Sequence, residues 1–246
     1  MQDLVYKGII IRQTDYGDAH RMLWIFTESD GIIKAVRYGI RGKKTSNAAA
    51  FQLFSYADFK LRPSRGDIMT AVSADVIDGF YAVSEDIKKL ALISYLAEIT
   101  YSVLGESNPD KRILSLFLNA VYAAAYRDEP YLKLKAVYEL KLMSAGGFMP
   151  GLDKCSACGD EGEYFSFDKG ALVCRKHHKA GDIKIDGLLL SLMRYITRCE
   201  DKKMLSFSVE NDDVIERLNE ISERYVSYQC DAEFKSLKYF YAICDM

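Results

Sequence analysis

The first 80 residues contain short runs of branched aliphatic and aromatic residues in which apolar and polar positions partly alternate. Such alternation is typical of β-strands with one buried face. Turn-forming sequences such as SDG and SRGD separate five of these runs, at residues 4–13, 20–29, 31–39, 56–63 and 67–77. Five short strands in one segment predict a small closed barrel, because closure removes exposed strand edges.

The connection between the third and fourth runs, IRGKKTSNAAAFQLF, is too long for a hairpin turn. Its first half is polar and offers little to bury. We therefore predict a mobile basic loop between these two strands.

From Ser84 onward the apolar residues recur every three or four positions, which predicts helices. These cover residues 87–104, 108–128, 131–145, 187–200, 213–228 and 233–244. Ser84 is the predicted N-cap of the first helix, and Asn211 or Asp212 of the fifth. Pro130 suits the first turn of the third helix, and Gly146 suits its end. The helices are apolar around much of their circumference, so we expect them to pack on one another and on the barrel.

These patterns predict an α+β multidomain protein with four parts along the chain. A small closed barrel occupies residues 1–80, and a helical bundle follows at 81–149. A metal-binding β-ribbon is inserted at 150–182, and the C-terminal helices at 183–246 complete the helical domain.

The composition is that of a globular protein, with 49% hydrophobic and 28% charged residues. The N-terminal sequence MQDLVYKGII has no basic segment followed by an apolar one, so we expect no secretory signal. The longest apolar stretch, residues 90–104, is too short to span a bilayer and contains Glu98. A cytoplasmic location and no membrane partner follow, and in that compartment clustered cysteines are ligands more often than disulfides.

Net charge is −2, but the basic residues are concentrated. Between Lys34 and Arg65 there are eight of them against one acid, Asp58: Lys34, Arg37, Arg41, Lys43, Lys44, Lys60, Arg62 and Arg65. A local basic stripe suits a polyanion regardless of total charge. Tyr38 or Tyr56 could add a stacking face for bases. The alternative interpretation is a solvated face with no partner.

Three cysteines and a histidine are spaced like zinc ligands: Cys155-x2-Cys158, fifteen residues, then Cys174-x2-His177. Each pair lets one tight turn present two ligands to a tetrahedral ion, and His178 could replace His177. A catalytic zinc keeps one position open, whereas here protein ligands fill all four. We therefore predict one structural Zn²⁺, with the intervening residues forming a two-stranded ribbon.

Neither a phosphate-binding lysine loop nor a nucleophile elbow occurs in the sequence, and His20 has no evident partner. We therefore expect no enzyme. A zinc-dependent hydrolase or deaminase would need an open metal position and a nearby carboxylate, and the H-x-E pairing of deaminases is missing.

The N-terminal segment YKGIIIRQTDYGDAHRMLWIFTESDGIIKAVRYGIRGKK, the strand FQLFSYADFKL and the pair CSACG and CRKHH resemble the RecO family of bacterial recombination mediators. The likeness spans essentially the whole chain and is strongest over residues 5–62 and 146–178. The chain departs from the family pattern at His177, where the family often has cysteine. The choice between His177 and His178 therefore stays open.

The resemblance implies a nucleoid-associated OB-fold protein that binds single- and double-stranded DNA and anneals complementary strands without ATP. It implies action with RecR and with the C-terminal tail of single-strand binding protein, so that RecA is loaded indirectly. The implied DNA surface comprises Arg37, Arg41, Lys43 and Lys44. We add Lys34 because of its charge and Tyr38 because its ring could stack on a base. A shallow groove edged by Arg127, Lys133 and Lys135 is the expected seat of the tail. The competing hypothesis is a protein–protein adaptor that does not touch nucleic acid.

Overall fold

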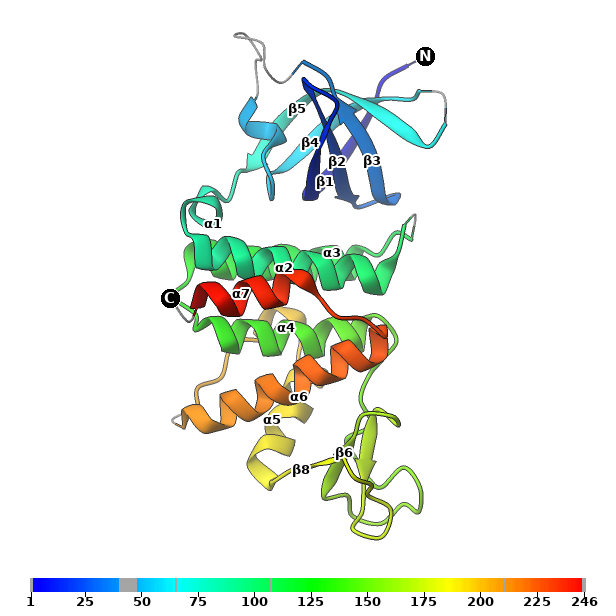
Figure 1. Cartoon of the computed structure of the whole chain (residues 1–246), viewed down its shortest axis with the longest axis vertical. Coiled ribbons are helices and arrows are strands. Elements are labelled where there is room, and N and C mark those ends of the chain that lie inside the picture. Colours follow the sequence, from blue (N-terminus) through cyan, green and yellow to red (C-terminus); the bar gives the residue numbers. More distant parts are fainter. Residues whose placement is uncertain (1, 40–47, 65, 107, 210, 245–246) are drawn as a thin grey trace. The chain divides into compact units, whose positions relative to one another are not determined.

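The computed structural model describes residues 2–39, 48–64, 66–106, 108–209 and 211–244. The chain forms two compact units, one of residues 1–127 and 236–246 and the other of residues 128–235. The predicted α+β architecture is confirmed: a closed five-stranded barrel is followed by helices, with a small β-ribbon between two of them (Figure 1). The four-part division along the sequence stays a prediction.

The barrel of the first unit contains β1 (Leu4–Tyr16), β2 (His20–Thr27), β3 (Gly31–Arg37), β4 (Tyr56–Arg62) and β5 (Ile68–Asp78). Its strands are ordered β1-β2-β3-β5-β4, and β4 returns to β1. All pairs are antiparallel except β3 with β5, in which Lys34, Ala35 and Val36 face Ile68, Met69 and Thr70. This order and the single parallel pair are those of an OB fold, as predicted.

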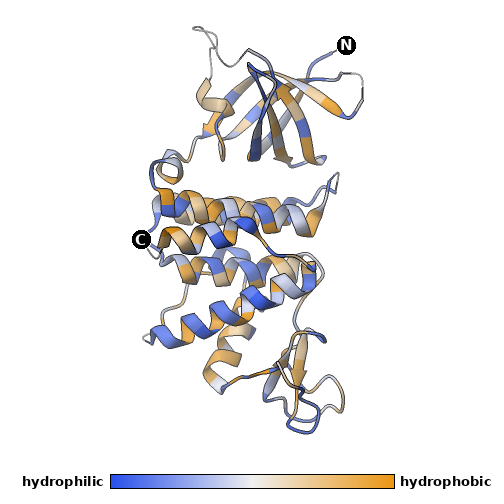
Figure 2. Cartoon of the chain, in the orientation of Figure 1, coloured by the Kyte–Doolittle hydropathy of each residue, from blue (hydrophilic) through white to orange (hydrophobic). Residues whose placement is uncertain are grey.

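Alternating residues fill the barrel, and Figure 2 shows hydrophobic and hydrophilic positions interleaved along its strands. β1 pairs with both β2 and β4 and carries a bulge between Ile10 and Arg12. At Gly8 a side chain could not fit, since a Cβ atom would lie 2.5 Å from the carbonyl oxygen of Phe26. The chain before β4 forms a short 3-10 helix, η1 (Ala48–Phe51), and Phe51 joins the barrel core.

The helices of this unit are α1 (Tyr81–Glu85), α2 (Ile87–Leu104), α3 (Lys111–Tyr126) and α7 (Lys235–Cys244), whose first residue belongs to the other unit. α2 packs against β1. The prediction of Ser84 as N-cap is wrong: the extended backbone of Asp86 separates α1 from α2, and its carboxylate accepts from the N–H groups of Lys88 and Lys89. The last helix lies almost wholly in this unit, and the backbone N–H of Ser236 donates to Glu98.

The second unit contains α4 (Tyr131–Ala145), α5 (Gly187–Arg198), the 3-10 helix η2 (Asp201–Lys203) and α6 (Asp212–Cys230). Between α4 and α5 lies a small sheet of β6 (Tyr164–Ser166), β7 (Ala171–Val173) and β8 (Ile183–Lys184), in the order β7-β6-β8. Asn211 caps α6, one of the two residues predicted for that role, and hydrophilic residues prevail along this helix in Figure 2. Among the described residues, no helix combines the length and the apolar character needed to cross a lipid bilayer.

A buried ionic network joins α4 to α6. Lys135 is fully buried, and its Nζ lies 2.9 Å from Glu139 Oε1, 2.8 Å from Glu223 Oε2 and 3.0 Å from Asn219 Oδ1. Ser222 donates a further hydrogen bond of 2.5 Å to Glu139. Ten consecutive residues of α4 are buried, so its charged side chains must find partners inside the protein.

Two further lysines of α4 are also held internally. Lys141 pairs with Asp201 at 3.1 Å, which ties η2 to the helix. Lys133 pairs with Glu129 at 2.9 Å and donates to the carbonyl oxygen of Phe207 at 3.0 Å. The charged residues of α4 therefore fix the segments that pack around it.

We predict that Lys135→Met destabilises the second unit strongly. The substitution leaves the buried Glu139 carboxylate without its cation, and breaking a buried pair in this way costs about 3–5 kcal/mol. Urea unfolding followed by circular dichroism measures the loss. The matched control is Lys203→Met, which removes a largely exposed ion pair with Glu200 and should cost less than about 1 kcal/mol. Equal losses in the two variants would contradict the prediction.

Candidate metal centre and nucleic-acid interface

The structure brings Cys155, Cys158, Cys174 and His177 together at the end of the small ribbon. Their ligand atoms all lie within 4.8 Å of one another. The Nδ1 atom of His177 is 3.2 Å from the Cys174 sulfur and 3.7 Å from the Cys155 sulfur, and the sulfurs of Cys158 and Cys174 are 3.7 Å apart. Donors held tetrahedrally at about 2.3 Å from one ion lie roughly 3.8 Å apart, so this cluster can hold a metal ion.

Backbone hydrogen bonds form the two turns that present these ligands. The N–H of Gly159 donates to Cys155 O at 2.9 Å, and that of Cys155 donates to Asp160 O at 2.8 Å. Gly159 has a φ of +79°, a left-handed conformation that favours glycine. On the other side, the N–H groups of His177 and His178 both donate to Cys174 O.

The two histidines differ in what they contact. The His177 ring lies in the cluster, whereas the His178 ring stacks on Tyr164 with centroids 4.3 Å apart and planes at 24°. The geometry therefore favours His177 as the fourth ligand.

The local electrostatics also favour a bound cation. Desolvation alone would raise the pKa of Cys155, but the backbone N–H groups of Ala157, Cys174 and Cys158 lower it to about 6. The N–H of Asp160 lowers the pKa of Cys158, but desolvation and the adjacent sulfurs outweigh it and raise that pKa to about 11. Thiolates this close repel one another, and a positive ion removes that repulsion.

On the barrel, the described basic residues of the stripe have internal partners. Lys34 pairs with Glu106 at 2.5 Å, while Lys60 and Arg62 both pair with Asp3, at 3.6 and 2.7 Å. These pairs are partly exposed, so they stabilise the barrel little and could be exchanged for phosphate. The predicted Arg41, Lys43 and Lys44, like Arg65, lie outside the described residues.

Arg37 lies in the third strand and is anchored to the barrel. It ends β3, and its Nη1 donates to the carbonyl oxygens of Ala71 and Val72 at 3.2 and 2.6 Å. Its guanidinium lies 4.6 Å from the centre of the Phe51 ring. Burial lowers the pKa of Arg37 from its usual value. Arg37 thus ties β3, β5 and η1 together.

The two candidate stacking residues also differ. Tyr38 is 51% exposed, and its ring meets His20 edge to face with centroids 4.7 Å apart. Tyr56 is half-buried and donates to Glu28 at 3.3 Å, and desolvation raises its pKa to about 12. Tyr38 is therefore the accessible one.

The predicted edge of a partner groove needs correction. Lys135 is fully buried in its ionic network, and Lys133 is held by Glu129 and by backbone carbonyls. Lys135 therefore cannot edge a surface groove, and Lys133 is engaged within the second unit. Arg127 is exposed, and its guanidinium lies 5.7 Å from the centre of the Tyr122 ring.

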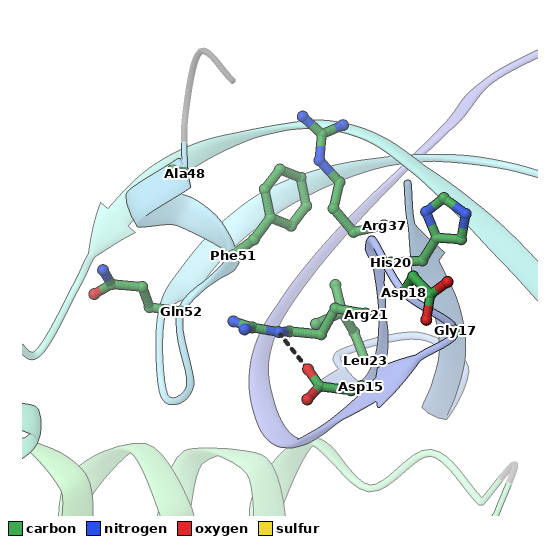
Figure 3. Close-up of a pocket in the computed structure, with 10 residues that line it drawn as sticks. All are labelled: Asp15, Gly17, Asp18, His20, Arg21, Leu23, Arg37, Ala48, Phe51 and Gln52. Atoms are coloured by element: carbon green, nitrogen blue, oxygen red, sulfur yellow. Dashed lines mark ion pairs between the residues drawn. The ribbon is translucent and has the colours of Figure 1, made fainter. Parts of the chain in front are cut away.

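Sequence reasoning missed a hollow at one end of the barrel. It lies where the turn between β1 and β2 meets the end of β3 and η1, and it is lined by Asp15, Asp18, His20, Arg21 and Arg37 among others (Figure 3). The DYGDA sequence indicates the turn, but only the folded barrel brings η1 to it.

Known proteins resemble the chain along its whole length. The family model described as Recombination protein O N terminal matches residues 1–80, and the one described as Recombination protein O C terminal matches residues 84–238. A protein of Acetivibrio thermocellus named DNA repair protein RecO is 31% identical over 97% of this chain and 96% of its own length. One of the same name from Alkaliphilus metalliredigens is 30% identical over 94% of this chain and 96% of its own length.

We predict that Arg37→Gln lowers the free energy of unfolding of the barrel by about 1–3 kcal/mol, because charged hydrogen bonds to two carbonyls are lost. Urea unfolding measures this. Arg62→Gln is the control: it removes the same charge from an exposed pair with Asp3 and should cost less. Wild-type stability in Arg37→Gln would show that this side chain is free for a ligand.

Proposed function

The chain belongs to the RecO family of DNA repair proteins, and on that premise we propose that it is a recombination mediator that binds DNA through its barrel. It binds single- and double-stranded DNA and anneals complementary strands without ATP. The observation that carries the proposal is the closed barrel of OB strand order, whose third strand leads into the basic segment of residues 37–44.

Charge and stacking chemistry support this proposal. Arg41, Lys43 and Lys44 follow β3 directly in the sequence and can neutralise phosphates. The exposed Tyr38 offers a ring face to a base. Arg37 holds the end of β3, after which these residues follow in the sequence, and Lys34 reaches a phosphate by leaving Glu106.

Partner proteins complete the proposed role. We propose that the chain acts with RecR and with the C-terminal tail of single-strand binding protein, and so helps RecA load on coated DNA at the nucleoid in the cytoplasm. It would act by binding rather than by catalysis. Of the three residues predicted to receive the tail, Arg127 is the accessible one, so the basic edge of that site includes residues not yet assigned.

We propose that the cysteine–histidine cluster holds one structural zinc ion. Thiolate and imidazole ligands suit zinc, and four protein donors leave no open position for a substrate. Bound there, zinc would fix the ribbon against α6, where the Phe165 ring meets Tyr225 edge to face at 5.4 Å.

The DNA proposal predicts that reversing Arg41, Lys43 and Lys44 to Glu weakens binding to all sequences alike. Each lost phosphate contact on a single strand removes about 0.7 from the slope of log affinity against log salt, so three lost contacts flatten the slope by about 2. Fluorescence anisotropy with labelled single strands at several salt concentrations measures both effects, and annealing should proceed without ATP in wild type.

The matched control reverses three exposed lysines of the second unit, Lys154, Lys202 and Lys203, for the same change in net charge. The control should bind nearly as wild type does. If both triple variants lose affinity equally, the effect is one of total charge. If neither loses affinity or annealing, the basic segment is not the DNA surface and the adaptor hypothesis is favoured.

The zinc proposal predicts one zinc per chain by elemental analysis, lost in Cys155→Ser and His177→Ala but kept in His178→Ala. Metal loss should speed hydrogen exchange in residues 150–182 while the barrel keeps its protection, because the two lie in different compact units. Carefully purified protein without metal, or equal loss in the two histidine variants, would overturn the assignment.

A further inference from the structure

The hollow at the barrel end is a built site of mixed chemistry. Its volume is about 440 Å³, within the range of about 300–1,000 Å³ typical of small-molecule sites. Figure 3 shows the aromatic ring of Phe51 and the guanidinium of Arg37 on one part of its wall and the polar side chains of the β1–β2 turn on another. The wall contains cations, carboxylates and an apolar surface within one cavity.

Arg37 provides a rigid, flat surface. Its two hydrogen bonds to backbone carbonyls and its contact with the Phe51 ring at 4.6 Å hold the guanidinium plane in place. Planar guanidinium and aromatic groups are the surfaces on which unstacked bases lie. Because the Arg37 side chain is already held in place, it loses little conformational entropy when a base binds.

Arg21 provides the charged donor for an anion, and His20 offers a second donor from the other face of β2. Arg21 is weakly held, 4.0 Å from Asp15 Oδ1 and 3.4 Å from Gln13 Oε1, so its guanidinium can turn to a phosphate. His20 Nδ1 accepts the backbone N–H of Gly39 at 3.3 Å. The neutral ring therefore has its proton on Nε2, where it is a hydrogen-bond donor.

Asp15, Asp18 and Gln52 provide acceptors near these donors. Carboxylate and amide oxygens accept from the exocyclic amino and ring N–H groups of bases. The carboxylates disfavour a simple anion, and the two arginines disfavour a metal ion. A ligand with a phosphate at one end and a flat, hydrogen-bonding ring at the other matches the cationic donors, the acceptors and the flat surface of the hollow.

We propose that this hollow takes one nucleoside monophosphate unit, with its base lying on the Arg37 and Phe51 surface and its phosphate against Arg21. This proposal rests on the proposed DNA-binding function and names the part of a strand that enters. The unit is one nucleotide of a single strand whose base has left the stack. The barrel thus holds a strand by one base as well as by its phosphates.

Amide NMR of the full chain with deoxynucleoside monophosphates, with deoxyribose 5-phosphate and with a five-nucleotide single strand tests the site. We expect the mononucleotides and the oligonucleotide to shift the amide signals of residues 15–21 and 48–52, and the sugar phosphate to leave them nearly unchanged. Arg21→Gln should weaken mononucleotide binding about tenfold, since it removes a charged hydrogen bond. Asp18→Asn is a second variant, which changes an acceptor proposed to face the base. It should reduce the difference in affinity between the mononucleotides.

Arg12→Gln is the matched control, because Arg12 lies on the same strand as Asp15 but its guanidinium lies over Trp24, outside the hollow. It should leave the mononucleotide shifts as in wild type. If the sugar phosphate reproduces the shifts, the hollow is an anion site and the base assignment is wrong. If the oligonucleotide binds without shifting these amides, the hollow proposal fails while DNA binding stands. If mononucleotides bind there and strands do not, the site stands and the DNA-binding function fails.

Discussion

Parallel pairing of β3 with β5 is the constraint on which the rest of the first unit depends. Parallel neighbours cannot be joined by a hairpin, so the chain between them includes η1 and β4 before it returns as β5. The return closes the barrel and removes its open edges. It also brings η1 to the mouth of the barrel, where Phe51 enters the core and meets Arg37. The hollow is a consequence of this closure, since its wall comes from the β1–β2 turn, β3 and η1 together.

Burial decides what each basic residue does. Arg37 and Lys135 both belong to patterns that look like binding surfaces in the sequence, yet each donates hydrogen bonds within its own unit. A buried cation without partners would be too costly to keep, so the fold supplies carbonyls or carboxylates. Lys60 and Arg62 keep exposed pairs that contribute little to stability. Breaking either of these exposed pairs therefore costs the barrel little stability.

The cysteine–histidine ribbon differs from the barrel, because the residues of its cluster lie close together in the sequence. Two tight turns, each built by backbone hydrogen bonds to Cys155 O and Cys174 O, present four donors from one short segment. Three-residue strands bury too little apolar surface to be stable alone, so the packing of Phe165 on Tyr225 stabilises them, as would an ion in the proposed zinc site. The barrel closes through long-range strand pairing, whereas the four candidate ligands of the ribbon come from one short segment.

The sequence by itself determined the five strands, the main helices and the ligand pairs, because alternation, helical period and C-x2-C spacing are local properties. It also identified Asn211 as a possible cap, but it placed the first helix cap at Ser84 instead of Asp86, since both residue types suit a cap and only backbone geometry selects one. Only the tertiary structure decided which basic residues are buried, that Tyr38 is exposed while Tyr56 is held by Glu28, and that η1 meets the β1–β2 turn. These features depend on contacts between residues distant in the sequence, which no local pattern encodes.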